Sequence, residues 1–135
     1  MKELTITAEV SNLETVTGFV EEQLEALECP MKAQIQINIA IDEIFGNIAQ
    51  YAYAPEIGNV TVRVESEDEP KMVKLTFIDS GVPYNPLTVE EPDTTLSADQ
   101  RPIGGLGIFM VKKSMDEMVY EYKEGKNILT IKKQL

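Results

Sequence analysis

Glu43 and Asn47 form a pair whose chemical types and spacing are suited to catalysis or ligand binding. They lie one helical turn apart within the otherwise apolar stretch Ile35–Tyr53. In a helix, this spacing places a carboxylate and an amide on one face, at the edge of the stripe that the isoleucines would bury. On this pair alone, the favoured interpretation is a polar flank that only solvates a core helix.

Asp79 is the second candidate, because it ends the strand-like alternation of residues 73–77. A buried carboxylate at a strand end can accept a hydrogen bond from the exocyclic amine of a base, and Gly81 would leave room for a flat ring beside it. The plainer interpretation is a turn that Asp79 forms with Ser80 and Gly81.

A glycine-rich segment, Gly104-Gly105-Leu106-Gly107, precedes a helical pattern from Ile108 to Met115. A helix N-terminus carries unpaired N–H groups and partial positive charge, and glycine lets the backbone approach an anion closely, so phosphate binding is one interpretation. Glycines also serve plain turns. The chain has no G-x-x-x-x-G-K-[ST] motif, and Met110 occupies the third-glycine place of a dinucleotide fingerprint, so neither a P-loop nor a Rossmann site is predicted.

Composition narrows the function classes. The formal net charge of −11 argues against direct nucleic-acid binding and favours a basic protein partner or simple solubility. Because the chain has no histidine, imidazole-based triads and zinc sites are excluded, and acid–base chemistry must use a carboxylate. The single Cys29 cannot form an internal disulfide, and no apolar run reaches the roughly 20 residues of a membrane span. We therefore expect a cytoplasmic protein with no membrane partner.

Hydrophobic periodicity predicts the elements that position these residues. Ile35–Ile41 alternates as a strand would, but the helical pattern continues to Ala52, so a helix is predicted. Ser11 and Glu14 form a capping-box pattern at the start of the preceding helix. The predicted order is a strand at 4–8, helices at 12–28 and 35–53, strands at 60–64 and 73–78, a helix at 108–115, and a hairpin of 118–122 with 128–132 across Gly125-Lys126-Asn127.

This order predicts an α+β fold, a two-layer α/β sandwich whose mixed, mostly antiparallel sheet carries helices on one face. A single domain is expected over residues 1–135. Residues 82–103 are rich in proline and acidic residues and show little periodicity, so they are interpreted as a lid between two glycine-bearing motifs.

Taken together, the motifs resemble the GHKL ATPase superfamily of gyrase, Hsp90, histidine kinases and MutL, and within it the small bacterial anti-sigma factor serine kinases. Glu43-Ile44-Phe45-Gly46-Asn47 resembles its E-x-x-x-N box, and Asp79-Ser80-Gly81-Val82-Pro83-Tyr84-Asn85-Pro86 resembles its D-x-G-x-P-[FY]-[DN]-P box. Gly104-Gly105-Leu106-Gly107-Ile108 resembles the second glycine box, and Met115-Asp116-Glu117 the short M-D-E that follows the third helix. The resemblance spans nearly the whole chain and implies a Bergerat-type ATP-binding fold.

The resemblance also implies roles for single residues. Asn47 would coordinate a Mg²⁺ ion that bridges the ATP phosphates, and Asp79 would hydrogen-bond the adenine amino group. Glu43 would be the general base that takes the proton from a serine hydroxyl, in keeping with the needs of phosphoryl transfer. The glycines implied are Gly81 in the base pocket and Gly104, Gly105 and Gly107 around the phosphates.

Two features depart from the family pattern. Gln50 stands where many relatives have a basic residue or histidine, which removes a phosphate contact. The expected lid is acidic, with Glu90 and Glu91 among its residues, and would repel phosphates if it closed tightly. Arg101 would supply positive charge there, or else is a solvated lid residue.

The function implied is that of an ATP-dependent serine/threonine protein kinase that acts as an anti-sigma factor in transcription regulation. It would phosphorylate a serine on a STAS-type anti-anti-sigma partner and bind a sigma factor, and the resemblance also suggests a homodimer. The alternative is a nucleotide-gated module that binds a regulator with little or no phosphotransfer, which Gln50 and the acidic lid motivate. A detached histidine-kinase domain is disfavoured by Glu43 and by the Pro83-to-Pro86 continuation.

Overall fold

A five-stranded antiparallel sheet forms one layer of the molecule. The computed structural model describes residues 1–88 and 105–135. The strands are β1 (Lys2–Thr7), β2 (Asn59–Glu67), β3 (Met72–Asp79), β4 (Glu117–Lys123) and β5 (Lys126–Gln134). Their order in the sheet is β1-β2-β3-β5-β4, and each of these pairings is antiparallel.

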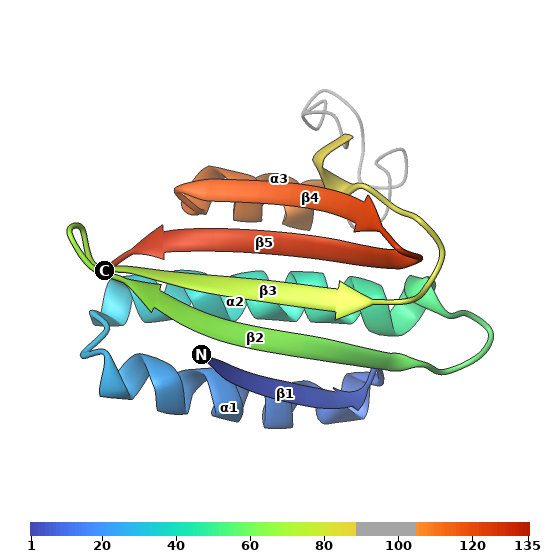
Figure 1. The fold of residues 1–135 in the computed structure, drawn as a ribbon, viewed down its shortest axis with the longest axis horizontal. Coiled ribbons are helices and arrows are strands. Elements are labelled where there is room, and N and C mark those ends of the chain that lie inside the picture. Colours follow the sequence, from blue (N-terminus) through green and yellow to red (C-terminus); the bar gives the residue numbers. More distant parts are fainter. Residues whose placement is uncertain (89–104) are drawn as a thin grey trace.

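Three α-helices form the second layer and lie behind the sheet (Figure 1). They are α1 (Leu13–Ala26), α2 (Met31–Asn47) and α3 (Gly105–Ser114). Short 3₁₀ turns, η1 (Val10–Asn12) and η3 (Pro86–Thr88), and one π-helical turn, η2 (Ile48–Ala52), complete the described elements. The predicted α+β sandwich with helices on one face is confirmed.

The core lies between the two layers, and the sequence pattern accounts for it. Alternate residues of β2 and β3 point toward the helices, because successive side chains of a strand face opposite sides of the sheet. These residues are almost fully buried and pack against the apolar stripes of α1 and α2. The central contributors are Val60, Val62, Val64, Val73, Leu75 and Phe77 from the sheet and Val16, Val20, Leu24, Ile37, Ile41 and Phe45 from the helices.

Exposure within α2 confirms that Ile35–Ile41 is helical. In a strand, the four alternating isoleucines would share one face. Here Ile37 and Ile41 are 0% exposed, whereas Ile35 and Ile39 are each 53% exposed. The helix starts earlier than expected, at Met31, directly after Pro30, whose fixed φ suits a helix start.

Two local predictions were wrong. The Ser11–Glu14 capping box does not form: Asn12 precedes α1 without a side-chain cap, and its Nδ2 donates instead to the Thr7 carbonyl at 2.9 Å. The last hairpin turns at Glu124 and Gly125, both with positive φ, so Asn127 belongs to β5 and not to the turn. A two-residue turn with positive φ at both positions matches strand twist, which explains the tighter connection.

Two further observations complete the fold. The third helix starts at Gly105, so Gly105 and Gly107 lie in its first turn and not before it. Of the lid predicted at residues 82–103, residues 89–103 lie outside the described residues. Of the helices in the described part of the chain, none has the length and apolar character needed to cross a membrane.

Two glycines give a matched test of this backbone. Gly18 lies inside α1, and apart from its chain neighbours and the backbone of its own helix no atom lies within 4 Å of the position that a Cβ would take, whereas Gly125 has φ +77° in the hairpin turn. We expect Gly18→Ala to stabilise the fold by about 0.5–1 kcal/mol, because alanine loses less backbone entropy in a helix. Gly125→Ala should destabilise it by about 1 kcal/mol or more, because its φ is unfavourable for a residue with a Cβ.

Urea unfolding of the two variants, compared with the parent chain, measures both changes. Equal shifts of the unfolding midpoint in the same direction would contradict this description of the α1 and hairpin backbones.

Candidate nucleotide site

A cavity of about 340 Å³ opens where α2 and β3 both end. This is within the usual size range of small-molecule sites, about 300–1,000 Å³. Its walls are mainly apolar and aromatic, with a few polar groups that include Asn47 and Asp79. The described residues that line it are Ile44, Asn47, Ile48, Tyr51, Ala52, Phe77, Asp79, Val82, Pro83, Tyr84, Pro86, Ile108, Tyr120, Asn127 and Leu129.

Asp79 is the buried acceptor of this cavity. It ends β3 and is 6% exposed. Its Oδ1 accepts hydrogen bonds from the Gly81 backbone N–H and from Asn127 Nδ2, both at 2.9 Å. Among the described residues no donor contacts Oδ2, so one carboxylate oxygen is left for a ligand on the cavity side. The Asp79–Gly81 turn uses Oδ1 alone, so the turn interpretation and the acceptor interpretation of Asp79 are compatible.

Asn127 holds Asp79 in place and was missed by the sequence reasoning. It faces Asp79 in the β3–β5 register and is 6% exposed. Besides Asp79, its Nδ2 donates to the Val82 carbonyl at 2.9 Å and, more weakly, to the Gly81 carbonyl at 3.4 Å. Its Oδ1 accepts from the Tyr84 N–H at 3.1 Å. One amide thus fixes the carboxylate and the chain that leaves β3.

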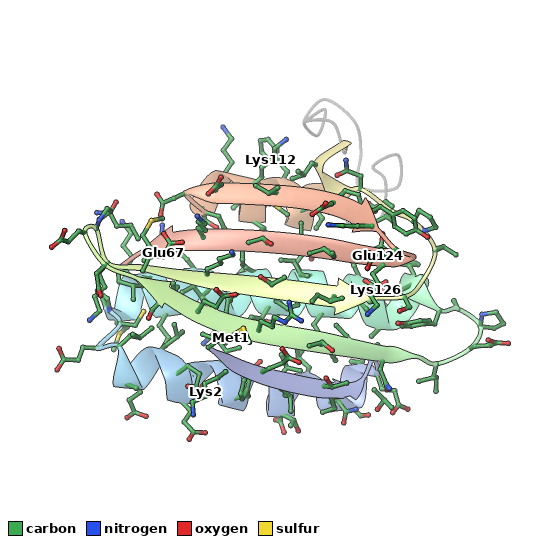
Figure 2. All side chains as sticks on the ribbon, in the orientation of Figure 1. Met1, Lys2, Glu67, Lys112, Glu124 and Lys126 are labelled. Atoms are coloured by element: carbon green, nitrogen blue, oxygen red, sulfur yellow. The ribbon has the colours of Figure 1, made fainter. Side chains whose placement is uncertain are left out.

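Tyr120 completes this hydrogen-bond network from β4. Its hydroxyl donates to Asn127 Oδ1 at 2.5 Å. Burial raises the pKa of the Tyr120 phenol, so it stays protonated and available as a donor at neutral pH. Figure 2 labels Glu124 and Lys126 at this end of the sheet, beside the hairpin turn that brings Tyr120 and Asn127 together. A sequence signal for Asn127 did exist. If the hairpin turn is assigned to Glu124 and Gly125 alone, Asn127 becomes a polar residue inside the following strand.

Gly81 permits a close approach between the end of α2 and the chain after β3. A Cβ at Gly81 would overlap the carbonyl group of Ala52. That carbonyl accepts a hydrogen bond from the Val82 N–H at 2.9 Å. Because the overlap would be with backbone, a side chain at Gly81 requires one of the two segments to move. Gly81 therefore shapes the cavity wall through packing.

Glu43 and Asn47 lie together, as their spacing predicts. Asn47 Nδ2 donates to Glu43 Oε1 at 3.4 Å, which leaves the amide oxygen of Asn47 for a cation or a ligand. Asn47 lines the cavity, whereas Glu43 is absent from the described lining. The Glu43 carboxylate instead occupies the place that a Cβ of Gly107 would take, so it packs against the first turn of α3.

The surroundings of Glu43 change its acidity. Burial raises the pKa of its carboxyl above the ordinary value of 4.5, and the hydrogen bond from Asn47 acts in the opposite direction. A carboxyl with a raised pKa is a better proton acceptor once it is ionised. Perturbed carboxyls at the edge of a cavity are candidates for functional groups.

The other candidates divide into described and undescribed residues. Gly105 and Gly107 lie in the first turn of α3, next to Ile108 of the cavity wall. Arg101 and Gly104 lie outside the described residues. In residues 1–88 and 105–135, no group of three or more His, Cys, Asp and Glu side chains is placed to hold a metal ion.

The M-D-E segment has a structural contact. Asp116 Oδ2 accepts from the Gln134 N–H at 2.6 Å and so ties the start of β4 to the end of β5. Lys113, in the last turn of α3, lies over the Phe109 ring with its Nζ 5.3 Å from the ring centre. Neither residue lines the described cavity.

This arrangement suits a flat base with phosphates. Aromatic and apolar walls can enclose a planar ring, the free Asp79 oxygen can accept from an amino group, and the Asn47 oxygen is a hard ligand. The first turn of α3 presents backbone N–H groups at a helix N-terminus, where anions bind favourably.

Comparisons with known proteins agree with this geometry. Residues 6–133 match the family model described as histidine kinase-like ATPase domain. Serine-protein kinase RsbW of Bacillus mycoides is 27% identical over 100 residues, which cover 71% of this chain and 61% of that relative. Serine/threonine-protein kinase BtrW of Bordetella bronchiseptica is 26% identical over 101 residues, which cover 74% of this chain and 70% of that relative.

The matched stretch thus spans 61% of the length of the Bacillus mycoides relative. The family match, in contrast, extends from the end of β1 almost to the end of β5. It includes the other described strands, the described α-helices and the cavity that Asn47, Asp79 and Asn127 line. The chain therefore belongs to the histidine kinase-like ATPase domain family, as the three sequence motifs suggested.

Proposed function

We propose that this chain is an ATP-dependent serine/threonine protein kinase of the anti-sigma factor type. Its substrate would be a serine on a STAS-type anti-anti-sigma partner, and it would also bind a sigma factor, as a cytoplasmic regulator of transcription. The observation that carries the proposal is the joint placement of Asn47 and Asp79 on one cavity, with Glu43 one helical turn from Asn47. Two relatives whose names include serine kinase activity support it.

In this proposal the cavity binds both ends of ATP, the adenine base near Asp79 and the phosphates near Asn47. The free oxygen of Asp79 would accept from the adenine amino group, and the aromatic wall would enclose the base. Asn47 would hold a Mg²⁺ ion through its amide oxygen. Because Mg²⁺ usually keeps several waters and takes phosphate oxygens as ligands, one protein ligand is sufficient, and the lack of a carboxylate cluster in the described chain fits this.

Glu43 would then serve as the base. Its carboxylate would take the proton of the partner serine as the serine oxygen bonds to the γ-phosphorus, while the bond from that phosphorus to the leaving oxygen of ADP breaks. Gly107 supports this role, because the absence of a side chain there gives the carboxylate its place between α2 and α3. Gly104, Gly105 and Arg101 are proposed to face the phosphates.

A second function has one observation in its favour. Glu43 is not among the described residues that line the cavity, so the chain would bind nucleotide even without a working base. Under this alternative, the protein is a nucleotide-gated module that holds its regulator and transfers little or no phosphate.

Glu43→Gln distinguishes the two functions. We expect the variant to bind Mg²⁺-ATP as the parent does but to transfer phosphate to the partner serine at least about 100-fold more slowly, because a positioned base typically contributes about 10²–10⁴-fold. Calorimetry measures binding, and transfer of labelled γ-phosphate measures the reaction. Glu56→Gln, an exposed carboxylate away from the cavity, is the matched control. Full transfer by Glu43→Gln would remove the base role, and no transfer by the parent would favour the binding module.

Glu43 should also lower the stability of the ligand-free fold at neutral pH. Because its pKa is raised in the folded state, folding favours the protonated form. The stabilising contribution is present below the unfolded pKa and is lost as pH rises through the folded pKa. We therefore expect Glu43→Gln to unfold at higher urea concentration than the parent near pH 7.5, with the difference shrinking toward about pH 4.5. If Glu43→Gln is less stable than the parent near pH 7.5, the ionised Glu43 does not destabilise the fold, and the prediction is wrong.

A substitution of Asn127 tests whether the Asp79 carboxylate must be held in place for nucleotide binding. Asn127→Asp keeps the shape but removes both N–H donors and places a second carboxylate, of like charge, beside Asp79. We expect Mg²⁺-ATP affinity to fall at least about tenfold at neutral pH, since a hydrogen bond to a charged group is worth about 1.5–3 kcal/mol. Tyr120→Phe, which keeps the Asp79 contact, should cost less. Parental affinity in Asn127→Asp would show that Asp79 does not need this anchor.

A further inference from the structure

We propose that the outer face of α2 is a docking surface for a basic, amphipathic helical segment of a partner protein. The surface, called the α2 ridge below, consists of Met31, Ile35 and Ile39. These side chains are 78%, 53% and 53% exposed, although each is large and apolar. The inference goes beyond the proposed function, because it concerns a surface that lies outside the nucleotide cavity.

The α2 ridge is continuous. Its residues are four apart, so they form one i±4 row, the row that commonly packs into the groove of another helix. From Met31 to Ile39 the ridge rises about 12 Å, a little over two helical turns, which is enough to contact about two turns of a partner helix. Aliphatic side chains exposed singly need no explanation, but a contiguous apolar row on a helix is a typical binding surface.

The neighbouring helix, α1, supplies negative charge beside the α2 ridge. Asn38 Nδ2 donates to Glu21 Oε1 at 3.0 Å, which identifies the flank of α1 that faces α2. Glu14 and Glu25 lie on the same flank, at spacings of seven and four residues from Glu21. The α1 sequence contains no lysine or arginine. Because a short connection joins α1 to α2, the two helices run antiparallel, so Glu25 lies toward Met31 and Glu14 lies beyond Ile39. One long side of the α2 ridge is therefore bordered by Glu21 and Glu25, without cations of their own helix.

The described helices carry few cations. The one basic residue of α2 is Lys32, in its first turn, and Lys112 of α3 lies at the opposite edge of the helix layer from α1 (Figure 2). A segment with leucine-like residues on one face and lysine or arginine on the adjoining flank would complement this surface.

The same charges disfavour two other occupants. A membrane surface is anionic and would be repelled by the acidic flank. A second copy would bring its own net charge of −11 against this one. A basic protein segment is the occupant that gains both from burial of the ridge and from the carboxylates beside it.

The test uses two designed helical peptides of about 15 residues, long enough to form a helix on binding. Both carry leucines at i, i+4 and i+8, and the adjoining flank carries lysines in one and glutamates in the other. Fluorescence anisotropy with the whole chain should show binding of the lysine peptide at least about tenfold tighter than of the glutamate peptide. The preference should weaken with added salt.

Variants locate the binding. Ile35→Ser combined with Ile39→Ser should weaken lysine-peptide binding at least about tenfold, as expected when two buried aliphatic contacts are lost. Val10→Ser combined with Ile57→Ser is the control, because these two side chains have similar exposure, 55% and 62%, but lie outside the ridge. This variant should bind the lysine peptide as the parent does. Glu21→Gln combined with Glu25→Gln should reduce the salt dependence of lysine-peptide binding, whereas Glu56→Gln combined with Glu121→Gln should not.

Nucleotide binding separates this inference from the proposed function. The Ile35→Ser, Ile39→Ser variant should bind Mg²⁺-ATP as the parent does, and Asp79→Asn should retain the lysine peptide while losing nucleotide. Four results would each overturn the docking surface: equal binding of the two peptides, unchanged binding by the ridge variant, preferential binding to vesicles of anionic lipid that the ridge variant loses, or a parent dimer that the ridge variant converts to monomer.

Discussion

The hydrogen bond between Asp79 and Asn127 is the interaction on which the candidate site depends. Both side chains are buried at 6% exposure, so each polar group must find a partner inside the protein or destabilise the fold. Asn127 meets this need through contacts with Asp79, Val82, Tyr84 and Tyr120, which belong to β3, the chain after it and β4. The carboxylate is thus held with one oxygen satisfied and one available, and the segment that forms the cavity wall is attached to the sheet by the same amide.

The end of α2 supplies the opposite wall through a second backbone constraint. After Asn47 the helix continues as the π-helical turn Ile48–Ala52, a rare geometry that often occurs at functional sites. The last carbonyl of this turn, that of Ala52, accepts from the Val82 N–H and lies where a side chain on Gly81 would be. The helix end and the strand end are therefore fixed to each other by backbone contacts.

The sequence predicted what depends on periodicity and spacing, and missed what depends on contacts between distant segments. The element order followed from alternation in the strands and from the helical pattern of α2, and Glu43 with Asn47 followed from a single helical spacing. Asn127 was missed because a one-residue choice of hairpin turn decides whether it lies in a loop or faces Asp79 across the β3–β5 pair. The expected cap at Ser11 failed for a similar reason: Asn12 bonds Thr7 of β1, a partner that local propensity cannot reveal.

The α2 ridge and the candidate site share one geometric relation. Met31, Ile35 and Ile39 are followed at the same spacing by Glu43 and Asn47, so the exposed apolar row runs directly into the acid–amide pair. The row winds slowly around the helix, because 4 residues exceed the 3.6 of one turn, and it passes from the outer face toward α3 and the cavity. If the docking proposal and the kinase proposal both hold, a partner segment seated on the ridge would end one turn from Glu43. Binding energy from the ridge would then serve to position the acceptor hydroxyl, which is the main requirement of phosphoryl transfer.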